Sequence, residues 1–135
     1  MATLVWNQSC TVGVQAMDDQ HGILLDALNE LRMALLQGAE GREIREMLRR
    51  TAGLMKMHLE SEDRLLALHA FPGLAKHREE KQRLMGRLEQ FNIRFEQRQR
   101  PAVYELVEFL RKWFTTHTSN DKRSYGLYLQ SRGVH

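Results

Sequence analysis

The stretch REIREMLRRTAGLMKMHLESEDRLLALH, residues 42–69, repeats its apolar side chains with the period of an α-helix. Side chains three or four positions apart share one face of a helix, because an α-helix has about 3.6 residues per turn. The face defined in this way consists of Ile44, Met47, Leu48, Thr51, Leu54, Met55, His58, Glu62 and Leu65. We therefore predict a long amphipathic helix over residues 42–70, with a histidine and a carboxylate on its buried face.

Three further segments show the same period, so helices are also predicted over residues 18–38, 74–99 and 101–130, the last with a C-terminal tail. The predicted core face of the first of them consists of His21, Leu24, Leu25, Leu28, Leu31 and Leu35. Long amphipathic helices with short connections are typical of an up-down-up-down four-helix bundle. The sequence therefore predicts an all-α fold in which residues 1–135 form a single domain.

The predicted helix ends rest on local signals. Residues 1–17, which include Trp6, lack a helical period and are predicted to form an N-terminal arm. Asp18 or Asp19 can accept backbone N–H groups as the N-cap of the first helix. Pro101 suits the first turn of the last helix, because an N–H group at that position would have no partner in the helix.

Composition excludes several classes of protein. The net charge is +3, and hydrophobic residues make up 42% of the chain, as in ordinary globular domains. No apolar run reaches the length of about eighteen residues that a membrane span needs. The single cysteine, Cys10, cannot form an internal disulfide, and no secretory signal is evident, so we expect a cytoplasmic protein. The basic residues form no stripe interleaved with aromatics, so no nucleic-acid partner is expected.

Each predicted helix carries one histidine on its apolar face: His21, His58, His77 and His117. A single histidine in such a place is more often a core residue that is hydrogen-bonded to a neighbour. Four buried imidazoles, however, need partners for all their ring nitrogens. A shared metal ion supplies those partners together, so the pattern indicates a metal site.

Two carboxylates are candidates for the same site. Glu62 lies one helical turn after His58, and Asp121 one turn after His117, so each can reach the face of its histidine. Glu62 could instead pair with Lys81 or an arginine, and Asp121 could be a solvated residue near a helix end. Imidazole and carboxylate without thiolate suit iron, manganese or zinc, and bundle cores are a known location for dinuclear iron.

The order of these motifs resembles that of the hemerythrins, and of bacteriohemerythrins in particular, over nearly the whole chain. The segments DDQH (residues 18–21) and HLESE (58–62) are similar to the family's first histidine segment and to its HxxxE segment. Phe71-Pro72 precedes the third histidine at the family's spacing. WFTTH (113–117) resembles the family's WLxxH segment, and Tyr125 stands where a tyrosine is common.

The resemblance implies a centre of two non-haem iron ions that binds O2 reversibly, in a carrier, store or sensor and not in an enzyme. The iron held by His21 and His58 would leave a coordination position open for O2. The second iron would be held by His77 and His117, and Glu62 would bridge the two ions. O2 is the partner that the resemblance implies, and protein partners stay unspecified.

Two positions depart from the family's pattern. Lys81, four residues after His77, stands where the family has a histidine ligand. Lys122, five residues after His117, stands where the family has a bridging aspartate, and Asp121 comes one residue early. One residue turns a side chain by about 100° on a regular helix. Either the helix is locally distorted to aim Asp121 inward, or this bridge is missing.

Lys81 leaves the second iron open to question. A charged ammonium roughly 5 Å from a divalent ion is repelled by about 6–7 kcal/mol at an effective dielectric constant near 20. Lys81 is therefore expected to reach the surface, to lose its proton, or to replace the metal by pairing with Glu62. The last outcome would leave a regulatory or interaction module with a degenerate, mononuclear or empty site. An oxidising enzyme is a third interpretation, for which the sequence offers no general base beyond the ligands.

Overall fold

The computed structural model describes residues 11–96 and 101–135 of the chain. Its helices are α1 (Gln15–Leu36), α2 (Gly41–Leu68), α3 (Leu74–Glu96), α4 (Pro101–Asp121) and α5 (Leu127–Ser131), with a π-helical turn, η2 (Lys122–Gly126), between the last two. Trp6, Cys10 and the predicted helix end at residue 99 lie outside the described residues. Within the described part of the chain, every helix is too short or too polar to cross a bilayer.

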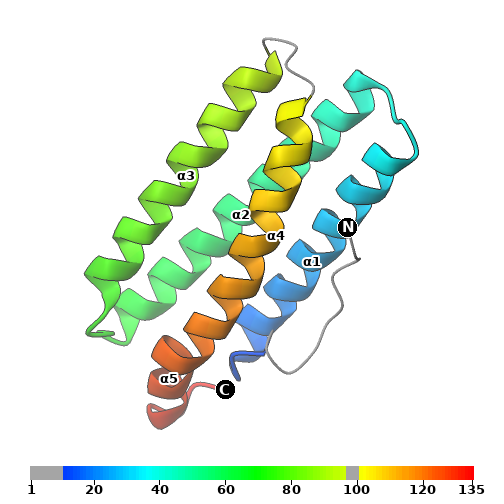
Figure 1. Cartoon of the computed structure of the whole chain (residues 1–135). Helices are drawn as coiled ribbons and strands as arrows, with labels where there is room; N and C mark the ends of the chain where they lie inside the picture. Colours follow the sequence, from blue (N-terminus) through cyan, green and yellow to red (C-terminus); the bar gives the residue numbers. More distant parts are fainter. Residues whose placement is uncertain (1–10, 97–100) are drawn as a thin grey trace.

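The long helices run alternately up and down and form a bundle (Figure 1). Each packs against its neighbours in the ring, α1 on α2, α2 on α3, α3 on α4 and α4 on α1. The predicted all-α, up-down-up-down four-helix bundle is confirmed. One helix after another therefore brings its apolar face to a common axis.

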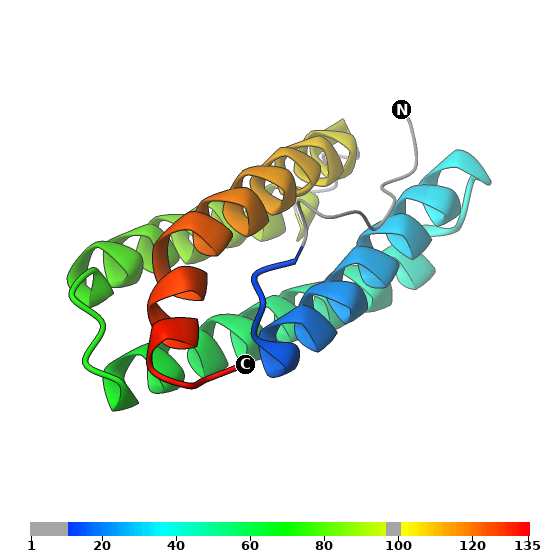
Figure 2. The same ribbon diagram turned by 90° about the horizontal axis from the view of Figure 1, so that it is seen from below.

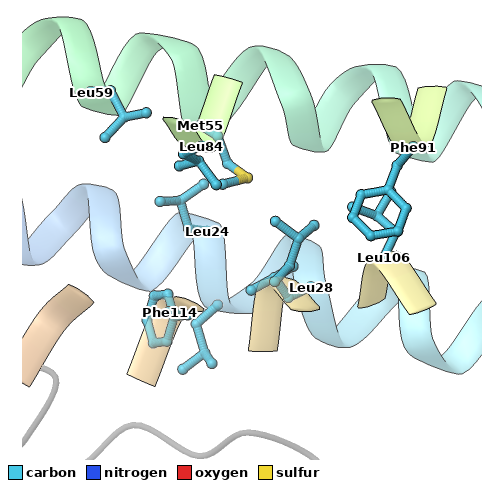
Figure 3. Packing of buried hydrophobic residues seen from close by; sticks show 10 residues of the cluster. Leu24, Leu28, Met55, Leu59, Leu84, Phe91, Leu106 and Phe114 are labelled. Carbon is cyan, nitrogen blue, oxygen red and sulfur yellow. The ribbon is translucent and has the colours of Figure 1, made fainter. Parts of the chain in front are cut away.

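The interior is an apolar cluster to which α1, α2, α3 and α4 all contribute. Its labelled members in Figure 3 are Leu24, Leu28, Met55, Leu59, Leu84, Phe91, Leu106 and Phe114. All six residues predicted for the core face of the first helix are buried. Burying one such aliphatic or aromatic side chain contributes about 1.5–3 kcal/mol to folding. This packing fixes the helix rotations, and with them the directions of the polar side chains on the same faces.

The first helix begins at Gln15, three residues before the earlier of the two predicted N-caps. Asp18 lies in the first turn and reaches back, where its carboxylate accepts the backbone N–H groups of Val12 (2.7 Å) and Gly13 (3.3 Å). A carboxylate in the first turn also faces the positive end of the helix dipole. The predicted capping role is therefore wrong, and Asp18 holds the arm against the helix instead.

The segment predicted as the last helix and its tail, residues 101–130, is not one regular helix. It is regular as far as Asp121, continues through η2, and resumes as α5. In a π-helical turn the backbone bonds run from i to i+5, which places more residues in each turn. Figure 2 shows this terminal part folding across the end of the bundle, beside the segment that leads into α1.

The described part of the arm packs into that end of the bundle. Val12 and Val14 are buried in a small apolar cluster with Tyr125 and Leu129. The side-chain amide of Gln130 donates to the carbonyl oxygen of Val12 at 3.0 Å. The segment that leads into α1 and the C-terminal segment around α5 therefore stabilise each other at this end of the bundle.

Gly126 lies where η2 meets the arm. A Cβ atom added there would overlap the carbonyl oxygen of Val12 and lie 3.2 Å from that of Asp121. We expect Gly126→Ala to lower the free energy of unfolding by about 1–3 kcal/mol, because backbone atoms on both sides must shift. Gly53, in α2, has open space around the same position, so Gly53→Ala is expected to raise it by about 0.5–1 kcal/mol. Urea denaturation measures the free energy of unfolding of both variants. If that of Gly126→Ala equals the native value, Gly126 does not pack tightly against the arm.

Candidate metal centre

The four histidines come from four different helices and meet inside the bundle. His21 lies on α1, His58 on α2, His77 on α3 and His117 on α4. The Nε2 atoms of His21 and His58 are 3.1 Å apart, and those of His58 and His117 are 3.3 Å apart. The structure thus brings together the side chains that the sequence singles out, at one level of the bundle.

Glu62 lies at the centre of this cluster and is fully buried. Its Oε1 atom is 3.4 Å from Nε2 of His58, 3.5 Å from Nε2 of His77 and 3.3 Å from Nε2 of His117. Its Oε2 atom accepts a short hydrogen bond from the phenol of Tyr125. The oxygens of Glu62 therefore face imidazoles and a phenol, and not Lys81 or an arginine.

Asp121 points inward and is 4% exposed, so it is not a solvated residue at a helix end. Its Oδ2 atom lies 2.7 Å from Nε2 of His117, one turn earlier. No distortion precedes it, because regular α-helical geometry already places residues four apart on one face. The distortion follows it instead. Tyr125 lies within the π-helical turn, is buried, and donates from its phenol to Glu62 at the centre.

The side chains with the spacing to hold a metal ion form two groups that share Glu62. Within each group, one ligand atom from every residue lies within 4.8 Å of the others. The first donor group is His21, His58, Glu62 and His117, and the second donor group is Glu62, His77 and Asp121. The resemblance pairs His117 with His77, whereas the structure places it with His21 and His58, in contact with Asp121 as well.

The donor atoms fit a metal ion better than they fit one another. Glu62 Oε1, Asp121 Oδ2 and Nδ1 of His77 are buried and have no hydrogen-bond partner. The short contacts of the two carboxylate oxygens with imidazoles lack the alignment of hydrogen bonds, and buried polar atoms without a hydrogen-bond partner are rare in proteins. Imidazole nitrogens and carboxylate oxygens that converge without thiolate suit iron, manganese or zinc.

The electrostatics of His58 and Glu62, two members of the first donor group, favour their metal-binding forms. Burial lowers the pKa of His58 to about 3, although the charge of Glu62 acts in the opposite direction. Burial would raise the pKa of Glu62, but His117 and His58 outweigh it and hold that pKa well below its usual range. Near neutral pH, His58 is therefore neutral and Glu62 ionised, which are the forms that bind metal.

Asp121, the second carboxylate, adds negative charge to the cluster. Burial acts to lower the pKa of His117, but the carboxylates of Glu62 and Asp121 outweigh it and raise that pKa to about 10. Burial, together with the charge of Glu62, raises the pKa of Asp121 to about 7. The two carboxylates thus hold positive charge between them, and a divalent cation would supply it more fully than one imidazolium.

Two contacts outside the donor groups fix the orientation of the rings. Nδ1 of His58 donates to Oε1 of Gln20 at 2.8 Å, with the tautomer set by this bond, and leaves Nε2 free for the centre. The ring of Trp113 stacks on His117, with centroids 4.4 Å apart. The role of Gln20 could not be predicted from the sequence, although this residue directly precedes His21.

Lys81 lies at the edge of the cluster. It is half-buried and lines a pocket of about 330 Å³ together with His77, His117 and Asp121. Arg78, with a smaller contribution from Lys81, lowers the pKa of the surface carboxylate of Asp63. Of the three expected outcomes, the structure favours a lysine that reaches toward the surface, and the described residues include no ion pair between Lys81 and Glu62.

The phenol of Tyr125 donates a hydrogen bond to the charged carboxylate of Glu62, so removing the hydroxyl should lower the stability of the protein. We expect Tyr125→Phe to lower the free energy of unfolding of the metal-free protein by about 1.5–3 kcal/mol, because a buried carboxylate oxygen loses its donor. Tyr128 donates instead to the neutral carbonyl oxygen of His69 at 2.6 Å. Tyr128→Phe is the matched control, with an expected loss of about 0.5–1.5 kcal/mol. Equal losses in the two variants would contradict the special role of the Glu62 contact.

Comparisons with known proteins agree with this geometry. The curated relatives include the bacteriohemerythrin of Stenotrophomonas maltophilia (strain R551-3), which is 27% identical over 128 residues and is matched over 93% of this chain and 80% of its own length. The bacteriohemerythrin of Pseudomonas aeruginosa (strain LESB58) is also 27% identical, over 125 residues with the same coverage. Both relatives confirm the resemblance seen in the sequence.

Solved structures and a family description lead to the same conclusion. Two crystal structures of hemerythrin mutants match the fold with a TM-score of 0.81, at 25% and 26% identity, and each match covers 93% of this chain and 96% of the other. Residues 12–126 match the family described as the hemerythrin HHE cation binding domain. The chain therefore belongs to the hemerythrin family.

Proposed function

We propose that this protein holds two non-haem iron ions inside the bundle and binds O2 reversibly there, as a carrier, store or sensor. The observation that carries the proposal is the sharing of Glu62 by the first and second donor groups. A carboxylate offers about four lone-pair sites, so Glu62 can contact two cations and still accept the bond from Tyr125. Membership in the hemerythrin family supports the choice of iron over manganese and zinc.

The proposed ligands are His21, His58, Glu62, His77, His117 and Asp121. When bound, a reduced iron pair would supply the reversible electron transfer that O2 binding requires. The chain's own part is to orient the ligands and to exclude water. Gln20 and Trp113 orient two of the imidazoles, and the ring of Phe114 meets that of His21 edge-on at 6.1 Å. Phe114 and Leu24 are buried in one apolar cluster, which meets the first donor group at the ring of Phe114.

We further propose that the protein acts by binding, without a net reaction, and that it does so in the cytoplasm. The support for binding alone is the composition of the centre, where the titratable groups are all proposed ligands or, like Tyr125, their hydrogen-bond partners. The single cysteine suits a reducing compartment. O2 is the proposed small-molecule partner.

Oxygen cycling tests the function. Protein loaded with iron, reduced without air and then moved repeatedly between air and argon is expected to gain and lose a visible absorption band. His58→Ala is expected to lose more than about 90% of this band, because the loss of a ligand lowers metal affinity more than the 10–100-fold typical of outer contacts. His69→Ala is the matched control. This half-buried histidine lies at the end of α2, the helix that carries His58, and belongs to neither donor group. Iron-loaded protein without any response to O2 would contradict the proposal.

The alternative function is a regulatory or interaction module of the same family with a degenerate site. The observation that favours it is Lys81, which lines the pocket beside the second donor group. Lys81→His separates the two functions. If the substitution raises the iron content and creates O2 binding, the native site is degenerate. If the native protein already holds two irons, the alternative is overturned.

A further inference from the structure

The second donor group lies against open space, which the first donor group reaches only through His117. The pocket of about 330 Å³ between α3 and α4 is lined by His77 and Asp121, together with exposed residues of α3 such as Glu80. A neighbouring pocket of about 380 Å³ reaches His77 and Asp121 from the side of η2. His21 and His58 line neither pocket. A small solute that enters either pocket therefore meets the second donor group.

The second donor group also has fewer protein ligands. It consists of three residues, whereas the first donor group has four. Asp121 Oδ2 and Nδ1 of His77 are buried beside the pocket and have no hydrogen-bond partner. Metal sites with three protein ligands usually complete their coordination with an exogenous ligand. A metal ion held by this group would have room for at least one exogenous ligand, which the pockets beside His77 and Asp121 would admit.

Lys81 adds a positive charge to the wall of this pocket. It lies one helical turn after His77, hence on the same face of α3, and is half-buried in the pocket wall. Arg83 and Arg87 also line the pocket, so three cations face the two carboxylates of Glu80 and Asp121. An ammonium and a metal ion repel each other when nothing lies between them. An anion between them is attracted by both, and it removes the conflict that Lys81 creates.

We infer that the second donor group and Lys81 together form a binding site for a small monovalent anion, which enters through the pocket between α3 and α4. The anion binds the metal ion with one atom and accepts a hydrogen bond from the Lys81 ammonium with another. This inference rests on the proposed function, because it requires a metal ion at the second donor group. It adds a second position for an exogenous ligand, away from the first donor group.

Azide is the probe for this site, and iron is counted before it is added. Air-oxidised protein is titrated with azide by absorbance and calorimetry, for the native chain and for three variants at equal iron content. Lys81→Met is expected to weaken azide binding at this site about tenfold, because a charge-assisted hydrogen bond is lost. Lys81→His is expected to bind one azide fewer per chain, because the imidazole occupies the open position. Lys112→Met, an exposed lysine of α4, is the matched control and should bind as the native chain does.

A crystal structure of the azide complex gives a readout that does not depend on affinity. The inference predicts azide in the pocket, in contact with both the metal ion at the second donor group and Nζ of Lys81. It is overturned if the native chain and all Lys81 variants bind azide equally, or if azide lies only at the first donor group. An iron content below two per chain would instead overturn the proposed function, and this inference with it.

Discussion

Glu62→Gln is expected to reduce the iron content from two ions per chain to one or none, and to abolish the response to O2. Glu62 is the one residue that both donor groups contain, and it is fully buried. Glutamine keeps the shape of the side chain but removes the negative charge that offsets two cations. Loss of a shared ligand should lower iron affinity by more than about 100-fold, which exceeds the effect of changing a residue that only hydrogen-bonds to a ligand. Iron analysis after dialysis against a weak chelator measures the change.

The control for this substitution lies on the same helix. Glu60 is two residues away, only partly buried, and belongs to neither donor group. Glu60→Gln therefore changes the net charge by the same amount and should leave two irons per chain. If Glu62→Gln retains both irons, Glu62 does not bridge them, and the division of the site into two groups that share it is wrong.

Phe114→Ala is expected to lower the free energy of unfolding by about 3–5 kcal/mol, the loss typical of removing a buried aromatic side chain. Phe114 is 1% exposed and packs in the central cluster with side chains of α1, α2 and α3. Its ring also meets His21 edge-on, so the cavity would open beside the first donor group. Small domains are stable by only about 5–15 kcal/mol, so much of the folding free energy would be lost. Urea denaturation of the metal-free protein measures it.

Tyr104 provides the aromatic control on the same helix. It is 46% exposed, so Tyr104→Ala should change stability by no more than about 0.5 kcal/mol. A loss below about 1 kcal/mol in Phe114→Ala would mean that the interior collapses around the missing ring. The packing would then not hold His21 in place in the way described above.

The fold could be predicted from the sequence because its helices are long and strongly periodic. The face that runs from His21 to Leu35 fixes which side of the first helix is buried, and the structure agrees with it. The inward direction of His58 and Glu62 follows from the same period. The bounds were harder to predict. Asp18 has the sequence of an N-cap, but its carboxylate binds the arm, a tertiary contact that local propensity does not encode.

The candidate site was predictable in its members and not in their grouping. A regular helix accounts for Asp121, but the π-helical turn that follows it contains Gly126, which packs against the arm more than a hundred residues away in sequence. The position of His117 beside His21 and His58 depends on the rotation of α4, which the packing of all four helices decides. Lys81 could be recognised as a departure from the family, but the pocket that it lines required the structure.

The iron content of the purified native protein tests the central claim most directly. Protein from iron-supplied cells, freed of loosely bound metal and quantified by amino-acid analysis, is measured for iron, zinc and manganese together. A dinuclear centre built on Glu62 predicts two irons per chain, with zinc and manganese near zero. One iron or none per chain, in protein that is folded and was supplied with iron, would contradict it.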